Sequence, residues 1–239
     1  MARRIRTFIA LQLTANIRQR LVAWQEKLAA AIPDVKWVEP ENLHVTLLFL
    51  GEVPDREVAE VCQRVEEAVA EVAPFPVLVE GMGCFPERRR PRVLWAGITT
   101  GAEQLQRVHA LLEKPLHYLG FRREERRYVP HITLGRLKAD REVPRLPELL
   151  REYRSCRGGE MLASEICIMA SQLERTGPVY TVMGRALFRG EDAGTTQPHA
   201  APEHGGLTPS APSGQGDTAS AAPFVGEDFV QPGDEPLMD

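Results

Sequence analysis

Two short phrases of the sequence place a histidine two positions before a threonine inside an apolar run. The first phrase is "HVTLLFLG", with His44 and Thr46, and the second is "HITLGRL", with His131 and Thr133. Residues two apart on a β-strand point to the same face, about 6.6 Å from each other. Each phrase therefore predicts a strand whose apolar side chains build a core while an imidazole and a hydroxyl share the opposite face.

Two imidazoles on converging strands are suited to paired proton transfer. With an ordinary pKa near ~6.5, one ring can accept a proton while the other supplies one. Phosphodiester cleavage needs such a pair, and threonine hydroxyls can donate hydrogen bonds to the non-bridging phosphate oxygens. Core packing accounts for a lone strand histidine but not for the repeated threonine. The phrases thus predict a catalytic site built from His44, Thr46, His131 and Thr133.

Arg136 is a further candidate, since a guanidinium can add a charge-assisted contact to a phosphate. It has the opposite parity from His131 on an ideal strand, so it needs a twist or a strand end, a freedom that Gly135 can supply. We interpret His109 and His117 as surface residues of a helix, and two histidines of the tail, His199 and His204, as inert. No Asp or Glu is spaced with the histidines, so the sequence predicts no metal site and no cofactor.

Two arginine clusters have two interpretations. They are "RRRPR", with Arg88, Arg89, Arg90 and Arg92, and "RREERR", which spans Arg122 to Arg127. Clustered arginines can steer an RNA backbone toward a site. A solvated surface explains them equally well, especially in the second cluster, where two glutamates offset the charge.

Hydrophobic periodicity predicts alternating strands and helices along the first 189 residues. Apolar residues alternate in strand fashion at 5–13, and recur at helical spacing at 17–28, 55–72 and 102–120. Further strands are predicted at 35–51, 75–85, 92–99 and 131–137, followed by a short helix near 146–153 and by apolar stretches at 161–173 and 179–188. Because the order of elements repeats, we expect an α+β fold of two pseudo-symmetric lobes, with mainly antiparallel sheets lining a central cleft and helices outside.

The chain divides by composition near residue 190. Residues 190–239 contain nine acidic residues and no Lys or Arg, so residues 1–189 carry 29 − 24 = +5 of formal charge. Gly or Pro occupies 15 of the last 50 positions, a composition that cannot offset the entropy of ordering. We expect a folded domain at 1–189 and a disordered acidic tail at 190–239.

Cysteine usage and the N-terminus bear on the cellular compartment. The four cysteines form no C-x-x-C pair, so we expect them to be reduced thiols. "MARRIRTFIALQL" has too short an apolar run for a signal peptide, and no segment approaches the ~20 apolar residues that cross a bilayer. These features favour a cytoplasmic protein with no membrane partner.

The phrases and their surroundings resemble a known family. Paired His-x-Thr phrases resemble the two-histidine (2H) phosphoesterase superfamily, and the wider text is similar to its RNA 2′,3′-cyclic phosphodiesterase branch, also called LigT-like or 2′-5′ RNA ligase. The stretches that carry the resemblance are "RTFIALQL", "ENLHVTLLFLG", "GCFPERRRPRVLWAGI", "YVPHITLGR" and "SQLERTGPVYTV", which together span roughly residues 3 to 188.

The resemblance implies a two-lobed fold and metal-independent opening of 2′,3′-cyclic phosphates at RNA ends or on nucleotides, giving a 2′-phosphate. It assigns His44 as the proton donor and His131 as the proton acceptor, an assignment that the near-symmetric phrases cannot make by themselves. Reversible 2′-5′ ligase activity is also implied. We expect a monomer. The competing hypothesis is a non-catalytic RNA- or nucleotide-binding module on the same fold.

Overall fold

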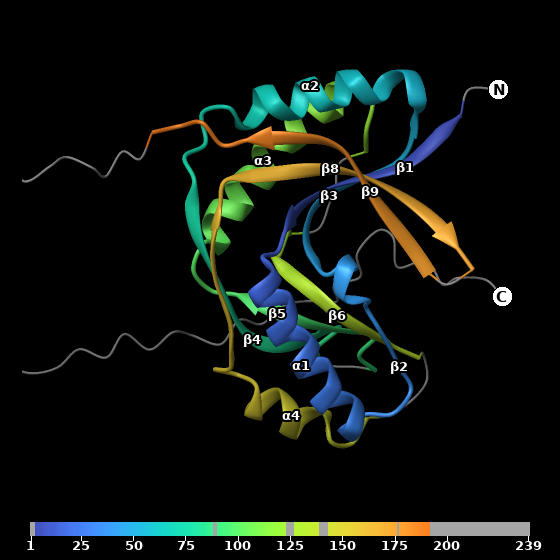
Figure 1. Ribbon diagram of the computed structural model, residues 1–239, viewed down its shortest axis with the longest axis vertical. Helices are drawn as coiled ribbons and strands as arrows, with labels where there is room; N and C mark the ends of the chain where they lie inside the picture. The colour runs from blue at the N-terminus through green and yellow to red at the C-terminus, as the bar shows by residue number, and fades with distance from the viewer. Residues whose placement is uncertain (1–2, 88–89, 123–126, 139–142, 176, 192–239) are drawn as a thin grey trace, which may run out of the picture.

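A computed structural model describes residues 3–87, 90–122, 127–138, 143–175 and 177–191 (Figure 1). The helices are α1 (Ala15–Ala31), α2 (Val58–Val69), α3 (Ala102–Tyr118) and α4 (Leu146–Glu152), with 3-10 turns η1 (Pro40–Asn42) and η2 (Asp55–Glu57). The strands are β1 (Arg4–Gln12), β2 (Val35–Trp37), β3 (His44–Pro54), β4 (Phe75–Phe85), β5 (Val93–Ile98), β6 (His131–Leu137), β7 (Arg157–Ala163), β8 (Glu165–Glu174) and β9 (Gly177–Leu187).

The strands form one sheet in the order β7-β4-β5-β6-β3-β1-β8-β9, with β2 added beside β6. Its described strand pairs are antiparallel. We call β3, β1, β8 and β9 the first lobe and β6, β5, β4 and β7 the second lobe. The lobes join where β3 meets β6, through the pair Val45 and Ile132. Four strands lie on each side of this join, and β3 and β6 are the innermost of them. Each histidine phrase therefore lies at the inner edge of its lobe.

The four helices cover one face of the sheet in two pairs. Helix α2 contacts β9 and α3 contacts β3, whereas α1 contacts β7 and β6. Tyr153, which follows α4, packs edge-on against Trp24 of α1 with ring centroids 5.4 Å apart. Figure 1 shows α2 and α3 together beside the first lobe, and α1 and α4 together beside the second. Helix α1 follows β1 of the first lobe but covers the second lobe, where β2, the next strand, pairs with β6. Helix α3 connects β5 to β6 of the second lobe but covers the first.

The core lies between the helices and the sheet. Its fully buried side chains are aliphatic and come from both layers, for instance Ile9, Leu47 and Leu134 of the sheet and Leu21 and Leu112 of the helices. Burying such a side chain contributes about 1.5–3 kcal/mol. A second, smaller cluster on the helix-free face consists of Phe8, Ala10, Cys167 and Met169. The sheet is therefore buried on both faces near β1 and β8.

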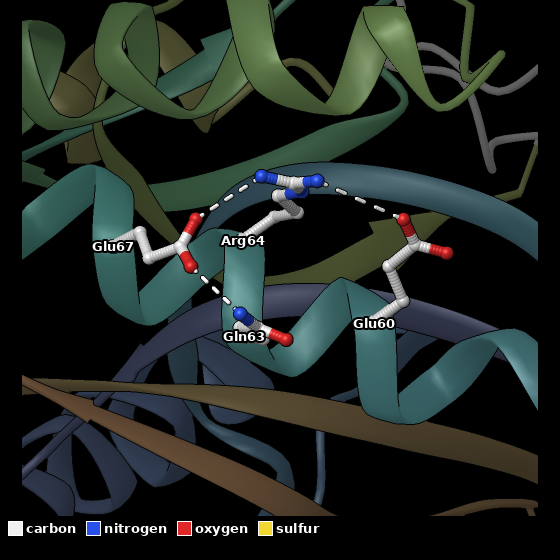
Figure 2. Close-up of polar contacts among 4 residues, drawn as sticks. All are labelled: Glu60, Gln63, Arg64 and Glu67. Carbon is white, nitrogen blue, oxygen red and sulfur yellow. Dashed lines mark hydrogen bonds and ion pairs between the residues drawn. The ribbon is translucent and has the colours of Figure 1, made fainter.

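Helix α2 illustrates how a helix packs on the outside of the sheet, with one apolar side and one charged side. Its valines at helical spacing, Val61, Val65 and Val69, are buried. On its solvent side, Arg64 lies 3.3 Å from the carboxylate of Glu67 and 3.9 Å from that of Glu60, and the Gln63 amide donates to Glu67 at 2.8 Å (Figure 2). Exposed pairs of this kind contribute only a few tenths of a kcal/mol each, roughly. The buried valines hold the helix in place.

The predicted α+β class, antiparallel pairing and exterior helices are confirmed, with two differences in detail. The lobes do not follow the chain in order, because β4 joins the second lobe and β8 and β9 return to the first. The strand predicted at 35–51 is broken into β2 and β3 by the Pro40 turn. The predicted end of the domain at residue 189 stays a prediction, and most of the predicted tail, 192–239, lies outside the described residues.

Candidate active site

The join between the lobes brings the two phrases together. Antiparallel pairing of Val45 with Ile132 places His44 across from Thr133, and Thr46 across from His131. Both pairing residues are fully buried in the helix-covered core. The imidazoles and hydroxyls therefore occupy the helix-free face, as the strand parity predicts.

The ring of His44 is oriented by its own strand and by the first lobe. Its Nδ1 donates to the backbone carbonyl of Asn42 at 2.6 Å, and its Nε2 lies 2.9 Å from the hydroxyl of Thr46. Phe8 packs on the ring at 5.0 Å between centroids, and Tyr180 contacts it edge-on at 5.5 Å. Since Nδ1 is used as the donor, Nε2 is the nitrogen left for proton transfer.

The ring of His131 is held in the same manner within the second lobe. Its Nδ1 donates to the carbonyl of Val129 at 2.7 Å. Phe85 contacts the ring edge-on at 5.1 Å, and Trp95 lies 6.2 Å away between centroids. Each histidine thus donates to the carbonyl two residues before it, so the two sites are equivalent at the level of hydrogen bonding as well as sequence.

Burial favours the neutral form of both imidazoles. Burial lowers the pKa of His44 from 6.5 to about 4, against the opposing effect of its bond to Asn42. Burial also lowers the pKa of His131 to about 4, and the charges of His44 and Arg136 lower it further while the bond to Val129 opposes this. The influence of His44 on the pKa of His131 reflects their proximity.

A bulge in β6 brings Arg136 to the helix-free face. The register against β5 skips Leu134, so Thr133 pairs with Trp95 while Arg136 pairs with Val93. One extra residue reverses the parity beyond it, which puts Arg136 on the side of His131. This bulge supplies the local change in the strand that Arg136 needs to reach the face of His131. Gly135 has an ordinary φ and instead gives β2 room, since a Cβ there would lie 2.6 Å from Val35.

Tyr180 of β9 was not predicted as a site residue. Burial raises the pKa of its hydroxyl, against the opposing charges of Arg136 and Arg6. Tyr180 therefore lies near both arginines, and its ring contacts that of His44 directly. The sequence signal for it is weak, because β9 is an edge strand whose described side chains are mostly half-buried or exposed.

The interpretation of His109 as a surface residue is wrong. Its side chain is buried in α3, and its Nδ1 donates to the carbonyl of Leu47 at 2.7 Å. Its position four residues after Leu105 and three before Leu112 could have indicated this, since both leucines face the core. His117 is exposed, as predicted, whereas His199 and His204 lie outside the described residues.

The arginine clusters are only partly described. Arg90, Arg92, Arg122 and Arg127 are exposed, while Arg88, Arg89 and residues 123–126 lie outside the described residues. Both interpretations of the clusters stay open.

Two features are absent from the described ranges. No three His, Cys, Asp or Glu side chains in that part of the chain are grouped so that they could hold a metal ion. Among the same residues, no helix is long and apolar enough to span a membrane. A cavity of about 130 Å³ near the end of α1 is lined by residues such as Ile32, Leu137 and Arg145, and by neither histidine nor threonine of the two phrases.

Comparison with known proteins places this arrangement in a family. The family model described as "LigT like Phosphoesterase" matches residues 11–95 and 98–180, which include both phrases and the strands that carry them. The chain belongs to the LigT-like phosphoesterase family. The resemblance predicted from the sequence is thereby confirmed.

Related proteins and solved structures agree with this membership. An RNA 2′,3′-cyclic phosphodiesterase of Methanothermobacter thermautotrophicus is 36% identical over 180 residues, covering 75% of this chain and 97% of the relative. One from Archaeoglobus fulgidus is 38% identical over 178 residues, covering 74% and 96%. The crystal structure of TT0787 from Thermus thermophilus has a TM-score of 0.67 and 32% identity, covering 79% of this chain and 100% of that one. Apo LigT from E. coli has a TM-score of 0.61 and 25% identity, covering 77% and 98%.

Proposed function

We propose that this chain is an RNA 2′,3′-cyclic phosphodiesterase that opens a terminal cyclic phosphate to a 2′-phosphate. The observation that carries the proposal is the pairing of Val45 with Ile132, which sets the two His-x-Thr phrases side by side with both Nδ1 atoms bound to carbonyls. The family membership and the names of the relatives support the same reaction.

In the proposed reaction, Nε2 of His131 removes a proton from water. The water oxygen then forms a bond to phosphorus as the bond from phosphorus to O3′ breaks. Nε2 of His44 supplies the proton to O3′. The product keeps the phosphate on O2′, and the proton balance is restored when the two histidines exchange protons with solvent. Thr46 and Thr133 donate hydrogen bonds to the non-bridging oxygens, and Arg136 offsets their charge.

The electrostatic environment supports His131 as the base. A base must be neutral before reaction, and the charges of Arg136 and His44 both favour the neutral form of His131. His44 must be charged to act as an acid. A bound phosphate anion supplies the favourable interaction, because a nearby negative charge stabilises the imidazolium and raises its pKa.

The test is incubation of the full chain with an oligonucleotide that ends in a 2′,3′-cyclic phosphate, with and without a chelator, followed by identification of the product isomer. We expect a 2′-phosphate in both conditions. His44→Ala and His131→Ala should each lower kcat by about 10² to 10⁴, the range for removal of a general acid or base. His117→Ala, on an exposed part of α3, is the matched control. Binding without turnover would favour the binding-module hypothesis, and activity lost to the chelator would contradict a metal-independent reaction.

Several finer points belong to the same proposal. Reversal of the reaction would join RNA ends through a 2′-5′ linkage, and product formation from a 2′,3′-cyclic end and a free 5′-hydroxyl would test it. The cytoplasmic location and the monomeric state stay predictions, which cell fractionation and sedimentation would check.

A further inference from the structure

Both histidine strands carry a bulge at the leucine that follows the threonine. The register of β3 against β1 skips Leu47, which follows Thr46, and the register of β6 against β5 skips Leu134, which follows Thr133. The two bulges occupy equivalent positions about the join between the lobes. A bulged residue is left outside the regular hydrogen-bond ladder, so its carbonyl depends on other donors.

A buried polar side chain from a helix donates to the carbonyl of each bulged leucine. Nδ1 of His109 on α3 donates to Leu47 at 2.7 Å. The amide of Gln25 on α1 donates to Leu134 at 2.8 Å and also to the carbonyl of Val38 at 2.8 Å. His109 is 8% exposed and Gln25 is 6% exposed, so both donors act away from solvent, where an unmade hydrogen bond is most costly.

These two contacts are reciprocal between the lobes. Helix α1 follows β1 of the first lobe, but its Gln25 holds the strand of the second phrase. Helix α3 connects strands of the second lobe, but its His109 holds the strand of the first phrase. Since β3 and β6 share a single residue pair, Val45 with Ile132, the sheet alone constrains their relative position weakly.

Further contacts reinforce each of these two hydrogen bonds. Tyr128 stacks on His109 with ring centroids 4.3 Å apart, and its hydroxyl donates to the carbonyl of Thr46 at 2.8 Å. On the other side, the N–H of Val38 donates to Leu134 at 2.9 Å. Glu113, one turn along α3, lies 3.8 Å from Nε2 of His109. The donors are therefore fixed in place rather than free to follow a moving strand.

We propose that His109 and Gln25 are reciprocal positioning residues that set the relative placement of the two histidine phrases across the join. Neither contacts the reacting atoms, and each acts through the backbone of the strand that it holds. The inference rests on the proposed function for its kinetic consequence. A displacement of about 1 Å between catalytic groups can cost about 10² in rate.

The test removes each donor while keeping the volume of its side chain. His109→Phe retains an aromatic ring for the stack on Tyr128, and Gln25→Met retains a similar length without an amide. With a 2′,3′-cyclic phosphate substrate, we expect each variant to lower kcat about 10- to 100-fold, with KM changed less than about threefold. His109→Asn places an amide nitrogen near the position of Nδ1 and should restore most of the kcat. The matched control is His117→Phe. The wild-type imidazole of His117 contacts the carbonyl of Phe121, which lies outside the histidine strands, so this variant should leave kcat unchanged.

A second readout does not depend on turnover. NMR resonances of the catalytic imidazoles should shift selectively, with His44 affected more by His109→Phe and His131 more by Gln25→Met. Thermal unfolding identifies variants that are folded at the assay temperature. Folded variants with unshifted resonances and unchanged kcat would overturn the proposal, as would a His109→Asn variant as impaired as His109→Phe. If the wild-type chain turned over no cyclic phosphate, the proposed function would fail while the selective shifts would still test the positioning.

Discussion

At the scale of single residues, the charge of Arg136 acts on His131, the proposed base. That charge lowers the pKa of His131, so Arg136→Gln should raise this pKa. Because His131 must be neutral to accept a proton, the acid limb of the kcat/KM profile should move to higher pH in the variant. Measurement of kcat/KM from pH 4 to 8 checks this. Arg136→Lys keeps the charge and should leave the limb near its wild-type position, and a limb that stayed in place in Arg136→Gln would contradict the electrostatic role.

The residues proposed to act through side-chain chemistry could be named from the sequence, whereas those proposed to act through the backbone could not. His44 and His131 stand out because an imidazole beside a repeated threonine has no packing explanation. His109 and Gln25 bind main-chain carbonyls, and such partners depend on where strands bulge. Helical spacing could have predicted that both side chains are buried, but the carbonyls that they bind could be identified only from the fold.

At the scale of elements, the hairpin of β8 and β9 is tied to the first phrase through Asn42. The side-chain amide of Asn42 donates to the carbonyl of Pro178 at 2.8 Å, while its own carbonyl accepts the bond from His44. Two residues beyond Pro178, Tyr180 packs against Phe8 and His44. Asn42 therefore links the ring of His44 to β9, whose Tyr180 packs against that ring.

Asn42→Ala should loosen this hairpin without removing the backbone bond to His44. A lost hydrogen bond of about 1 kcal/mol corresponds to roughly a fivefold effect. We expect faster amide hydrogen exchange in residues 177–182 and a loss of about that size in kcat/KM. Glu41→Ala, at the exposed neighbouring position, is the control. Unchanged exchange in the hairpin would show that Asn42 does not anchor it.

The existence of most elements could be predicted from periodicity, but their partners could not. Regular alternation indicated β1, β3 and β6, and the Pro40 turn that separates β2 from β3 broke the pattern too briefly to be recognised. The crossing of β4 to the second lobe, and the return of β8 and β9 to the first, depend on long-range pairing that no local pattern encodes.

At the scale of the whole molecule, the two histidines of the proposed site contribute to acid stability. Each has a pKa lowered from 6.5 to about 4 in the folded chain, so the unfolded chain binds protons first as the pH falls. Stability therefore declines between about pH 6.5 and about pH 4, by on the order of 3 kcal/mol for each histidine. Carboxylates also titrate in this range, so the contribution of the histidines must be separated by substitution.

The separation comes from urea unfolding of the wild-type chain and of the His44→Gln, His131→Gln double variant at pH 7, 5.5 and 4.5. The comparison uses the change in unfolding free energy between pH values, because the substitutions also alter stability at pH 7. We expect the double variant to lose less stability on acidification than the wild type does, whereas His117→Gln should follow the wild type because His117 is exposed. An equal loss in the double variant would mean that the imidazoles are not held neutral by the fold. In that case the substrate, and not the fold, would have to set their protonation states.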